Sequence, residues 1–163
     1  MLPKLKLPLA LPENSDYNFV IVIMVRKGVQ TMGKGAEFLK EAGTYFIATS
    51  DGNGQPQLRP FGSKLEYQGR FYINTGKSKN VFKQIIANPK ISIAAMKPNR
   101  DWIRVIAEAV LDESEEVRDY LFEQSPRMRE NYGDNLQECA IFYLQQAICI
   151  INEAGKEPEQ VEL

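Results

Sequence analysis

The segment Asn74–Asn80, with the sequence NTGKSKN, carries residue types that bind phosphate. It follows a run of β-forming residues and precedes an amphipathic run, so it is expected to join a strand to a helix. A helix N-terminus presents unpaired N–H groups and a partial positive charge, which stabilise an anion. The segment therefore predicts a phosphate cradle, with an ordinary capped helix bearing surface lysines as the alternative. The side chains expected to contribute are Thr75, Lys77, Ser78 and Lys79.

Gly76-Lys77-Ser78 also resembles the end of the phosphate-binding loop of nucleoside triphosphatases. That loop requires a glycine five residues before Gly76, and this sequence has Phe71 there, inside a predicted strand. No glycine-rich loop is formed, so triphosphate hydrolysis is not expected. Gly76 instead allows a ligand to approach the backbone closely.

A second candidate element is Arg59-Pro60-Phe61-Gly62-Ser63-Lys64. The planar guanidinium of Arg59 can bind two phosphate oxygens at once. Arg59 and Lys64 are five residues apart, so a regular strand would point them to opposite faces. Both can serve one site only if the strand bends near Pro60–Gly62, where proline and glycine allow a break. The alternative is that one of the two is simply exposed.

Trp102 and Arg104 form the third candidate element. Strand alternation places both on one face, whereas Ile103, Val105, Ala107, Ala109 and Leu111 would face the core. A tryptophan beside an arginine on the non-core face can line a ligand pocket or a subunit interface. The alternative is a tryptophan that covers the end of a barrel.

The composition is that of an ordinary globular chain of 163 residues, with 44% hydrophobic and 25% charged residues and a net charge of -1. Neither nucleic acid nor a membrane is expected as a partner. Residues 59–90 form a basic window with seven Lys or Arg and one acid, and residues 108–119 are acidic, which fits a small anionic ligand or two solvated faces. The chain has no histidine, so histidine-based triads and the commonest metal and haem ligand are excluded.

The elements that must position these residues are mostly short strands. Turns at short spacing and six or so strands predict a mainly β (α+β) protein, a small barrel with helical insertions. Ser78 is expected to cap a helix that runs to about Ala87 with an apolar stripe including Ile86. The other expected helices are Ala36–Ala42 and Glu113–Gln124, and the expected strands are Thr44–Ser50, Gln55–Glu66, Arg70–Thr75, Lys90–Met96, Trp102–Leu111 and Cys139–Ile151.

The chain is expected to consist of an N-terminal extension (1–34), the barrel (35–152) and a polar, frayed tail (153–163). Phe19–Val25 could be an added strand, or the natural start could be Met24 or Met32. Cys139 and Cys149, ten residues apart on one strand, would be separated by roughly 33 Å and could not bridge. Buried thiols and the lack of a signal peptide or a membrane-spanning run lead us to expect a cytoplasmic protein.

From about Ala36 to Ile151 the sequence resembles the pyridoxamine 5′-phosphate oxidase-like FMN-binding split barrels. It resembles in particular their short members related to nitroimidazole-resistance proteins. The resembling residues are Glu37-Phe38-Leu39, Phe46–Thr49, Gln55–Gly62, Phe71–Asn80, Gln84, Asn88-Pro89, Trp102–Val105, Ser125-Pro126 and Tyr132. Ala107 stands where the family often has glycine, a mild change. The tryptophan- and arginine-containing C-terminal extension of the true oxidase is missing, so pyridoxamine phosphate oxidation is a less favoured alternative.

The resemblance implies a six-stranded antiparallel split β-barrel that forms a homodimer with FMN between the subunits. The protein would be a flavin-dependent oxidoreductase acting on a small molecule, with NAD(P)H as a possible reductant; the alternatives are a flavin carrier without a dedicated substrate and a module that has lost the cofactor. No catalytic residue and no metal site is assigned. The residues expected at the cofactor are Arg59, Pro60, Phe61, Gly62, Ser63, Lys64, Ile73, Asn74, Thr75, Lys77, Ser78, Lys79, Asn80 and, from the partner subunit, Trp102.

Overall fold

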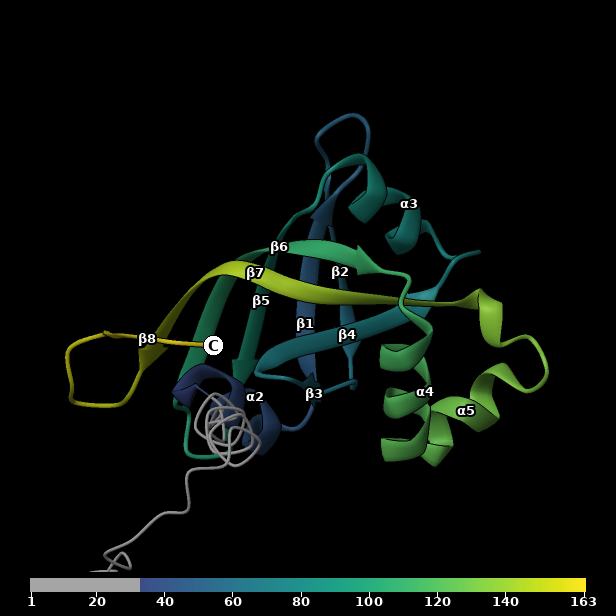
Figure 1. The fold of residues 1–163 in the computed structure, drawn as a ribbon. Coiled ribbons are helices and arrows are strands. Elements are labelled where there is room, and N and C mark those ends of the chain that lie inside the picture. Colours follow the sequence, from purple (N-terminus) through teal and green to yellow (C-terminus); the bar gives the residue numbers. More distant parts are fainter. Residues whose placement is uncertain (1–32) are drawn as a thin grey trace, which may run out of the picture. The chain divides into compact units, whose positions relative to one another are not determined.

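The computed structural model describes residues 33–163 (Figure 1). The predictions for residues 1–32, including the strand Phe19–Val25 and a start at Met24 or Met32, lie outside the described residues. The first described helix, α2, begins at Lys34 and ends at Ala42 before Gly43, two residues longer at its start than expected.

One antiparallel sheet organises the described chain. Its order is β2-β1-β5-β6-β7-β4-β3, and β8 pairs with β7 beside this path. In residues 33–163 six strands have six or more residues, as expected, and two further strands have only three. The bounds are β1 (Tyr45–Ser50), β2 (Pro56–Phe61), β3 (Leu65–Tyr67), β4 (Arg70–Gly76), β5 (Lys90–Met96), β6 (Trp102–Asp112), β7 (Cys139–Asn152) and β8 (Glu159–Val161).

The predicted strand Gln55–Glu66 is two strands, because the chain breaks between β2 and β3 at Gly62, Ser63 and Lys64. Such a break is the condition under which Arg59 and Lys64 could point to the same side of the strand. β2 and β3 lie at opposite ends of the strand order, so these three residues connect the two ends of the sheet.

The helix after β4 does not begin where the sequence predicted. Helix α3 spans Asn80–Ala87, its N-cap is Lys79, and no side chain caps it, so the assignment of Ser78 as N-cap is wrong. A turn forms first: the N–H of Lys79 donates to the carbonyl of Gly76 at 3.1 Å, and the N–H of Ser78 donates to the Glu138 carboxylate at 2.7 Å. Ile86, expected in the apolar stripe, is 53% exposed.

The acidic region contains helix α4 (Glu115–Gln124), capped by Ser114. It is followed by an unpredicted helix, α5 (Pro126–Tyr132), and a short 3₁₀ turn, η1 (Leu136–Glu138). A signal for α5 was present in the sequence, because proline at the first position and Gly133 just beyond the end are typical helix boundaries.

The C-terminal segment is not a frayed tail. Strand β8 pairs with the second half of β7, with Val161 opposite Cys149. The N–H of Gly35 donates to the carbonyl of Glu162 at 2.8 Å, and Val161 and Leu163 pack against the core. The prediction failed because a polar composition hides the few apolar residues that hold this segment to the sheet.

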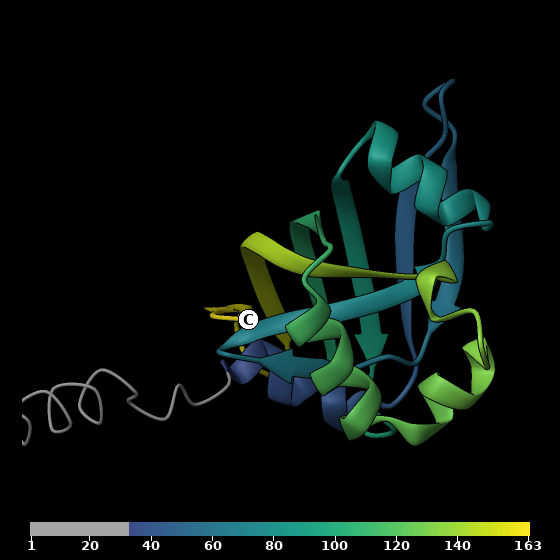
Figure 2. The ribbon, with the colours of Figure 1, turned by 45° about the vertical axis from the view of Figure 1, so that its right-hand side comes forward.

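The two faces of the sheet are covered differently. One core lies between the sheet and helices α2 and α3, and it includes Leu39, Ile47 and Ile85. A second core lies under α4 and α5 and includes Tyr72 and Leu121. Figures 1 and 2 show α4 and α5, in green, beside β4 and away from β1 and β5.

No helix covers the other side of β1, β2, β5 and β6 in the described part of the chain, and large apolar side chains are exposed there. Trp102 and Ile106 of β6 point to this side, whereas Ile103 and Val105 are fully buried, as the alternation predicted. We call this the outer face, and its exposed apolar side chains are Phe46, Leu58, Met96, Trp102, Ile106 and Ile148.

Both cysteines lie on β7 as buried, free thiols, which confirms that they do not pair with each other. Burial raises the pKa of Cys149 to about 11 and also raises that of Cys139. Within residues 33–163 no helix is both long enough and apolar enough to cross a membrane.

Candidate functional site

A cavity of about 260 Å³ opens between β2 and β4, the region where the two ends of the sheet meet. We call it the seam cavity. Two of the segments predicted from the sequence line it, one around Arg59 and one around Asn74. The start of α3 forms its remaining wall. The lining residues are Arg59, Pro60, Phe61, Gly62, Ser63, Asn74, Thr75, Lys79 and Val81.

Arg59 reaches the seam cavity from β2 and is anchored beneath it. Its guanidinium donates to Thr49 Oγ1 at 2.6 Å and to Gln84 Oε1 at 2.9 Å, and more weakly to the carbonyl of Ile47 at 3.3 Å. Thr49 Oγ1 in turn donates to Gln84 Oε1 at 2.6 Å. Burial lowers the pKa of Arg59 from its ordinary value. Three of the five N–H donors of the guanidinium are thus used among the described residues, and two remain for a ligand.

Ser63 lies in the break between β2 and β3. Its main-chain carbonyl accepts a hydrogen bond from the buried hydroxyl of Tyr45, which fixes the break to β1. Burial raises the pKa of Tyr45, so this hydroxyl stays protonated. The Ser63 Oγ atom is itself buried and has no partner among the described residues. An unsatisfied buried hydroxyl is unfavourable by about 1–3 kcal/mol unless a ligand or water pairs with it.

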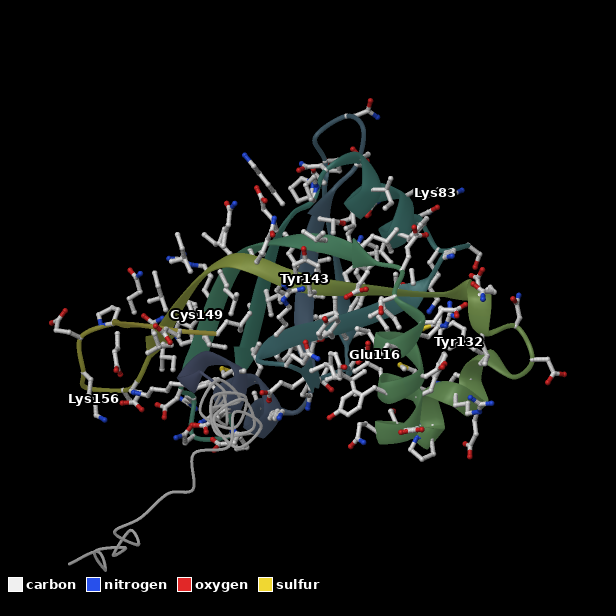
Figure 3. All side chains as sticks on the ribbon, in the orientation of Figure 1. Lys83, Glu116, Tyr132, Tyr143, Cys149 and Lys156 are labelled. Carbon is white, nitrogen blue, oxygen red and sulfur yellow. The ribbon has the colours of Figure 1, made fainter. Side chains whose placement is uncertain are left out.

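Asn74 and Thr75 line the seam cavity from β4. The Asn74 amide lies within 3.4 Å of the Tyr132 hydroxyl and 3.8 Å of Cys139 Sγ, so the helix pair α4–α5 is tied to the cavity wall. Tyr132 lies between α5 and the start of β7 (Figure 3). Burial raises the pKa of Tyr132, which keeps its hydroxyl neutral beside the amide.

The turn between β4 and α3 separates the two lysines of the predicted cradle. Lys79 lines the seam cavity, whereas Lys77 lines a different cavity of about 170 Å³ beside Asp112 and Arg118. Neither lysine has an ion-pair partner among the described residues. Lys83 points away from the sheet on α3 (Figure 3), so the basic window does not act as one site.

A larger cavity of about 580 Å³ adjoins the seam cavity and shares Gly62, Ser63 and Asn74 with it. Its other wall comes from α4 and α5. The remaining lining residues are Lys64, Leu65, Gln124, Ser125, Arg127, Met128 and Asn131. It contains two cations and no carboxylate, and Lys64 also donates to the Lys40 carbonyl at 3.4 Å.

The remaining predicted cofactor residues lie elsewhere in the protomer. Ile73 is buried in the core, and Ser78 and Asn80 are exposed beside the seam cavity without lining it. Trp102 lies on the outer face opposite Met96 and Asn152. Three parts of the site were not predicted, because their proximity to the cradle depends on long-range packing: the α5 wall, Val81 and the carboxylate of Glu138.

The sequence profile of the family described as pyridoxamine 5′-phosphate oxidase matches residues 32–147. None of the curated proteins matches the chain. A solved NimC/NimA family protein from Clostridium acetobutylicum is 36% identical with a TM-score of 0.73, over 78% of this chain and 88% of that one.

More distant solved structures show the same fold. A putative pyridoxamine 5′-phosphate oxidase from Listeria innocua is 15% identical with a TM-score of 0.54, over 77% of this chain and 94% of that one. The haem storage protein HutZ from Vibrio cholerae is 20% identical with a TM-score of 0.55, over 67% of this chain and 84% of that one. With its antiparallel sheet, its seam cavity and this profile match, the chain belongs to the pyridoxamine 5′-phosphate oxidase-like family of split barrels.

Proposed function

We propose that this protein binds FMN in the seam cavity and acts as a flavin-dependent oxidoreductase on a small molecule. One observation carries the proposal: two distant segments, Arg59–Ser63 and Asn74–Lys79, meet around a cavity with two cations and no carboxylate in its lining. The buried, unpaired Ser63 Oγ supports it further, because such an atom requires a ligand hydrogen bond or water.

The phosphate would be held at the start of α3, one residue later than the sequence predicted, because the N-cap is Lys79 rather than Ser78. The backbone N–H groups of Lys77, Ser78 and Lys79 already donate within the chain. The first N–H groups of α3, those of Asn80 and Val81, have no intrahelical acceptor and no partner among the described residues. Together with Lys79 and the two remaining donors of Arg59, they would form the anion site at the positive end of the helix.

Bound FMN would supply the electron transfer itself, so the protein needs no strong acid or base. The residues of this chain would bind and orient the flavin and exclude water from it. Thr49 and Gln84 fix Arg59, and Tyr45 fixes the main chain at Ser63. A solved relative is named as a haem storage protein. This chain contains no histidine, the commonest haem ligand, and this favours flavin over haem here.

The adjoining cavity would receive the small-molecule substrate or the reductant, with NAD(P)H as the candidate donor. It shares a wall with the seam cavity, and Lys64 and Arg127 would attract an anionic or electron-rich molecule. The free thiols on β7 fit a reducing compartment, which supports a cytoplasmic location.

We also propose that the outer face binds a second copy of the chain to form a homodimer. The face carries exposed apolar side chains on several adjacent strands; Leu58 is 67% and Met96 63% exposed. Several large apolar side chains exposed on one face, here with Arg104 among them, are typical of an interaction site in a globular protein. Trp102 lies on it and would approach the FMN of the partner subunit, so this proposal accounts for a residue that the protomer leaves outside the cavity.

The experiment is to purify the protein, record its visible spectrum and titrate the flavin-free form with FMN. Absorption at about 450 nm and saturable binding would support the proposal. A colourless protein that fails to bind added FMN would refute it. Steady NAD(P)H oxidation with a quinone or a nitro compound would distinguish an enzyme from a flavin carrier, which binds FMN without such turnover.

A further inference from the structure

Glu138 lies 60 residues after Ser78 in the sequence but contacts the turn that ends at Lys79. Its Oε1 accepts from the N–H of Ser78 at 2.7 Å, and its main-chain carbonyl accepts from the N–H of Lys77 at 2.8 Å. The same residue thus holds two consecutive N–H groups through two different oxygens. The turn between β4 and α3 is thereby attached to the end of η1, directly before β7.

Gly76 makes room for this carboxylate. A Cβ atom added at Gly76 would lie 2.9 Å from Glu138 Oε1, closer than such contacts occur. The side chain of Lys79 lies over the same glycine, with Cγ and Cε at 3.7 Å from the same point. Glu138 and the stem of Lys79 therefore meet above Gly76.

The electrostatic environment keeps Glu138 ionised. Hydrogen bonding by Ser78 lowers the pKa of the Glu138 carboxyl below its ordinary value of 4.5, and the charges of Lys77 and Lys79 add to this. A carboxylate that accepts backbone N–H bonds is a strong acceptor, and its bonds are worth more than those of a neutral group.

We propose that Glu138 is the positioning residue of the anion site: it fixes the turn Gly76–Lys79 and so directs Lys79 into the seam cavity. Glu138 does not line that cavity, and it acts through the turn. This inference rests on the proposed function, because it assigns to Glu138 a part in holding the FMN phosphate. This role also explains why a carboxylate lies beside Lys77 and Lys79, two cations that would otherwise attract an anionic group of the ligand.

The test compares two uncharged variants. Glu138→Gln keeps an oxygen that can accept from Ser78, whereas Glu138→Ala removes it. We expect Glu138→Gln to bind FMN at least about fivefold more tightly than Glu138→Ala, because only Glu138→Gln keeps a side-chain acceptor for the N–H of Ser78. Both variants keep the main-chain bond to Lys77. Riboflavin, which lacks the phosphate, should bind both variants with the same affinity. Glu123→Gln, an exposed substitution on α4, is the matched control.

Gly76→Ala provides an independent route to the same state, since its only close clash is with Glu138. It should weaken FMN binding in the wild type and have no further effect in Glu138→Ala. Equal FMN affinities of the Gln and Ala variants would overturn the proposal. So would an equal loss of riboflavin binding, which would show a general structural role.

The contact itself can be tested without flavin. The amide proton of Ser78 should titrate with a midpoint below 4.5 in the wild type and lose that titration in Glu138→Gln. If the wild type fails to bind FMN while the amide titrates as expected, the proposed function fails and the turn contact stands. If the amide does not titrate, the positioning role fails regardless of FMN binding.

Discussion

The two halves of the sheet are built from the same kinds of residues but are covered differently. Strand β4 buries residues on both faces, with Ile73 toward α3 and Tyr72 toward α4 and α5. Strand β6 buries Ile103 and Val105 on one face and exposes Trp102 and Ile106 on the other. Helices α4 and α5 cover the Tyr72 side of β4. Among the described residues, no helix covers the side of β6 that carries Trp102 and Ile106.

On the functions proposed above, the two regions would take different kinds of occupant. The outer face is broad and apolar, which suits another protein surface. The seam cavity, where the two halves meet, is small and cationic, which suits a small anion. The substitutions below separate these two occupants.

The largest effect is expected on the outer face. Ile106→Glu should raise the dimer dissociation constant by about a hundredfold or more, because each protomer would bury an unpaired carboxylate. Ile106 is 48% exposed in the protomer, and its partners on the neighbouring strands β5 and β7 are Ser92 and Ile148. Sedimentation velocity over a dilution series measures the constant.

The control for this substitution is Ile86→Glu, since Ile86 is similarly exposed at 53% but lies on α3. It should leave the dimer intact. A wild-type protein that is monomeric at all concentrations, or an equal effect of the two variants, would contradict the assignment of the outer face.

The next effect separates the two lysines of the turn. Lys79→Ala should weaken FMN binding by about tenfold or more, because a charge-assisted contact is lost, and Lys77→Ala by about twofold or less. The reason is that only Lys79 lines the seam cavity. Quenching of flavin fluorescence gives both constants, and Lys83→Ala is the control. A larger effect of Lys77 would place the phosphate on the other side of the turn.

Arg59→Lys should have a smaller effect on FMN, a loss of about fivefold, because the charge remains and the planar fork does not. The variant also loses the paired contacts to Thr49 and Gln84 that orient the group. Arg70→Lys, in which the replaced guanidinium lies 4.5 Å from the Tyr143 ring centre, is a matched control away from the cavity. Calorimetric titration with FMN checks both, and unchanged affinity would remove Arg59 from the site.

The smallest effect is expected at Ser63, where one substitution should raise the stability of the flavin-free protein and lower its affinity for FMN. Ser63→Ala should stabilise the flavin-free protein by up to about 1 kcal/mol, because an unsatisfied buried hydroxyl is removed. The same change should weaken FMN binding by about threefold. Urea unfolding and flavin titration measure the two, with Thr44→Ala, which removes an exposed hydroxyl before β1, as the control. Losses in both would indicate that Ser63 already has a partner in the free protein.

Much of the architecture was predictable from local patterns. Period-two alternation located β6 and its buried residues, and the expected strand Thr44–Ser50 corresponds to β1 (Tyr45–Ser50) within one residue. A bend after Arg59 was the stated condition for Arg59 and Lys64 to serve one site. The break forms, but Arg59 lines the seam cavity and Lys64 lines the adjoining one. The errors fell at Ser78, Ile86 and the C-terminal segment, where a distant partner overrides the local preference.

The residue types at Arg59–Ser63 and Asn74–Lys79 are enough to indicate an anion site, because charge, hydroxyl groups and chain-bending residues are properties of short segments. Which of these residues face one cavity depends on contacts between distant parts of the chain. Glu138 contacts the turn Gly76–Lys79 from a distant part of the chain, and Lys77 and Lys79 line different cavities. Helix α5 supplies a wall that no spacing rule connects to Lys64. Local sequence carries chemistry and short-range geometry, whereas the meeting of the two ends of the sheet results from packing of the whole domain.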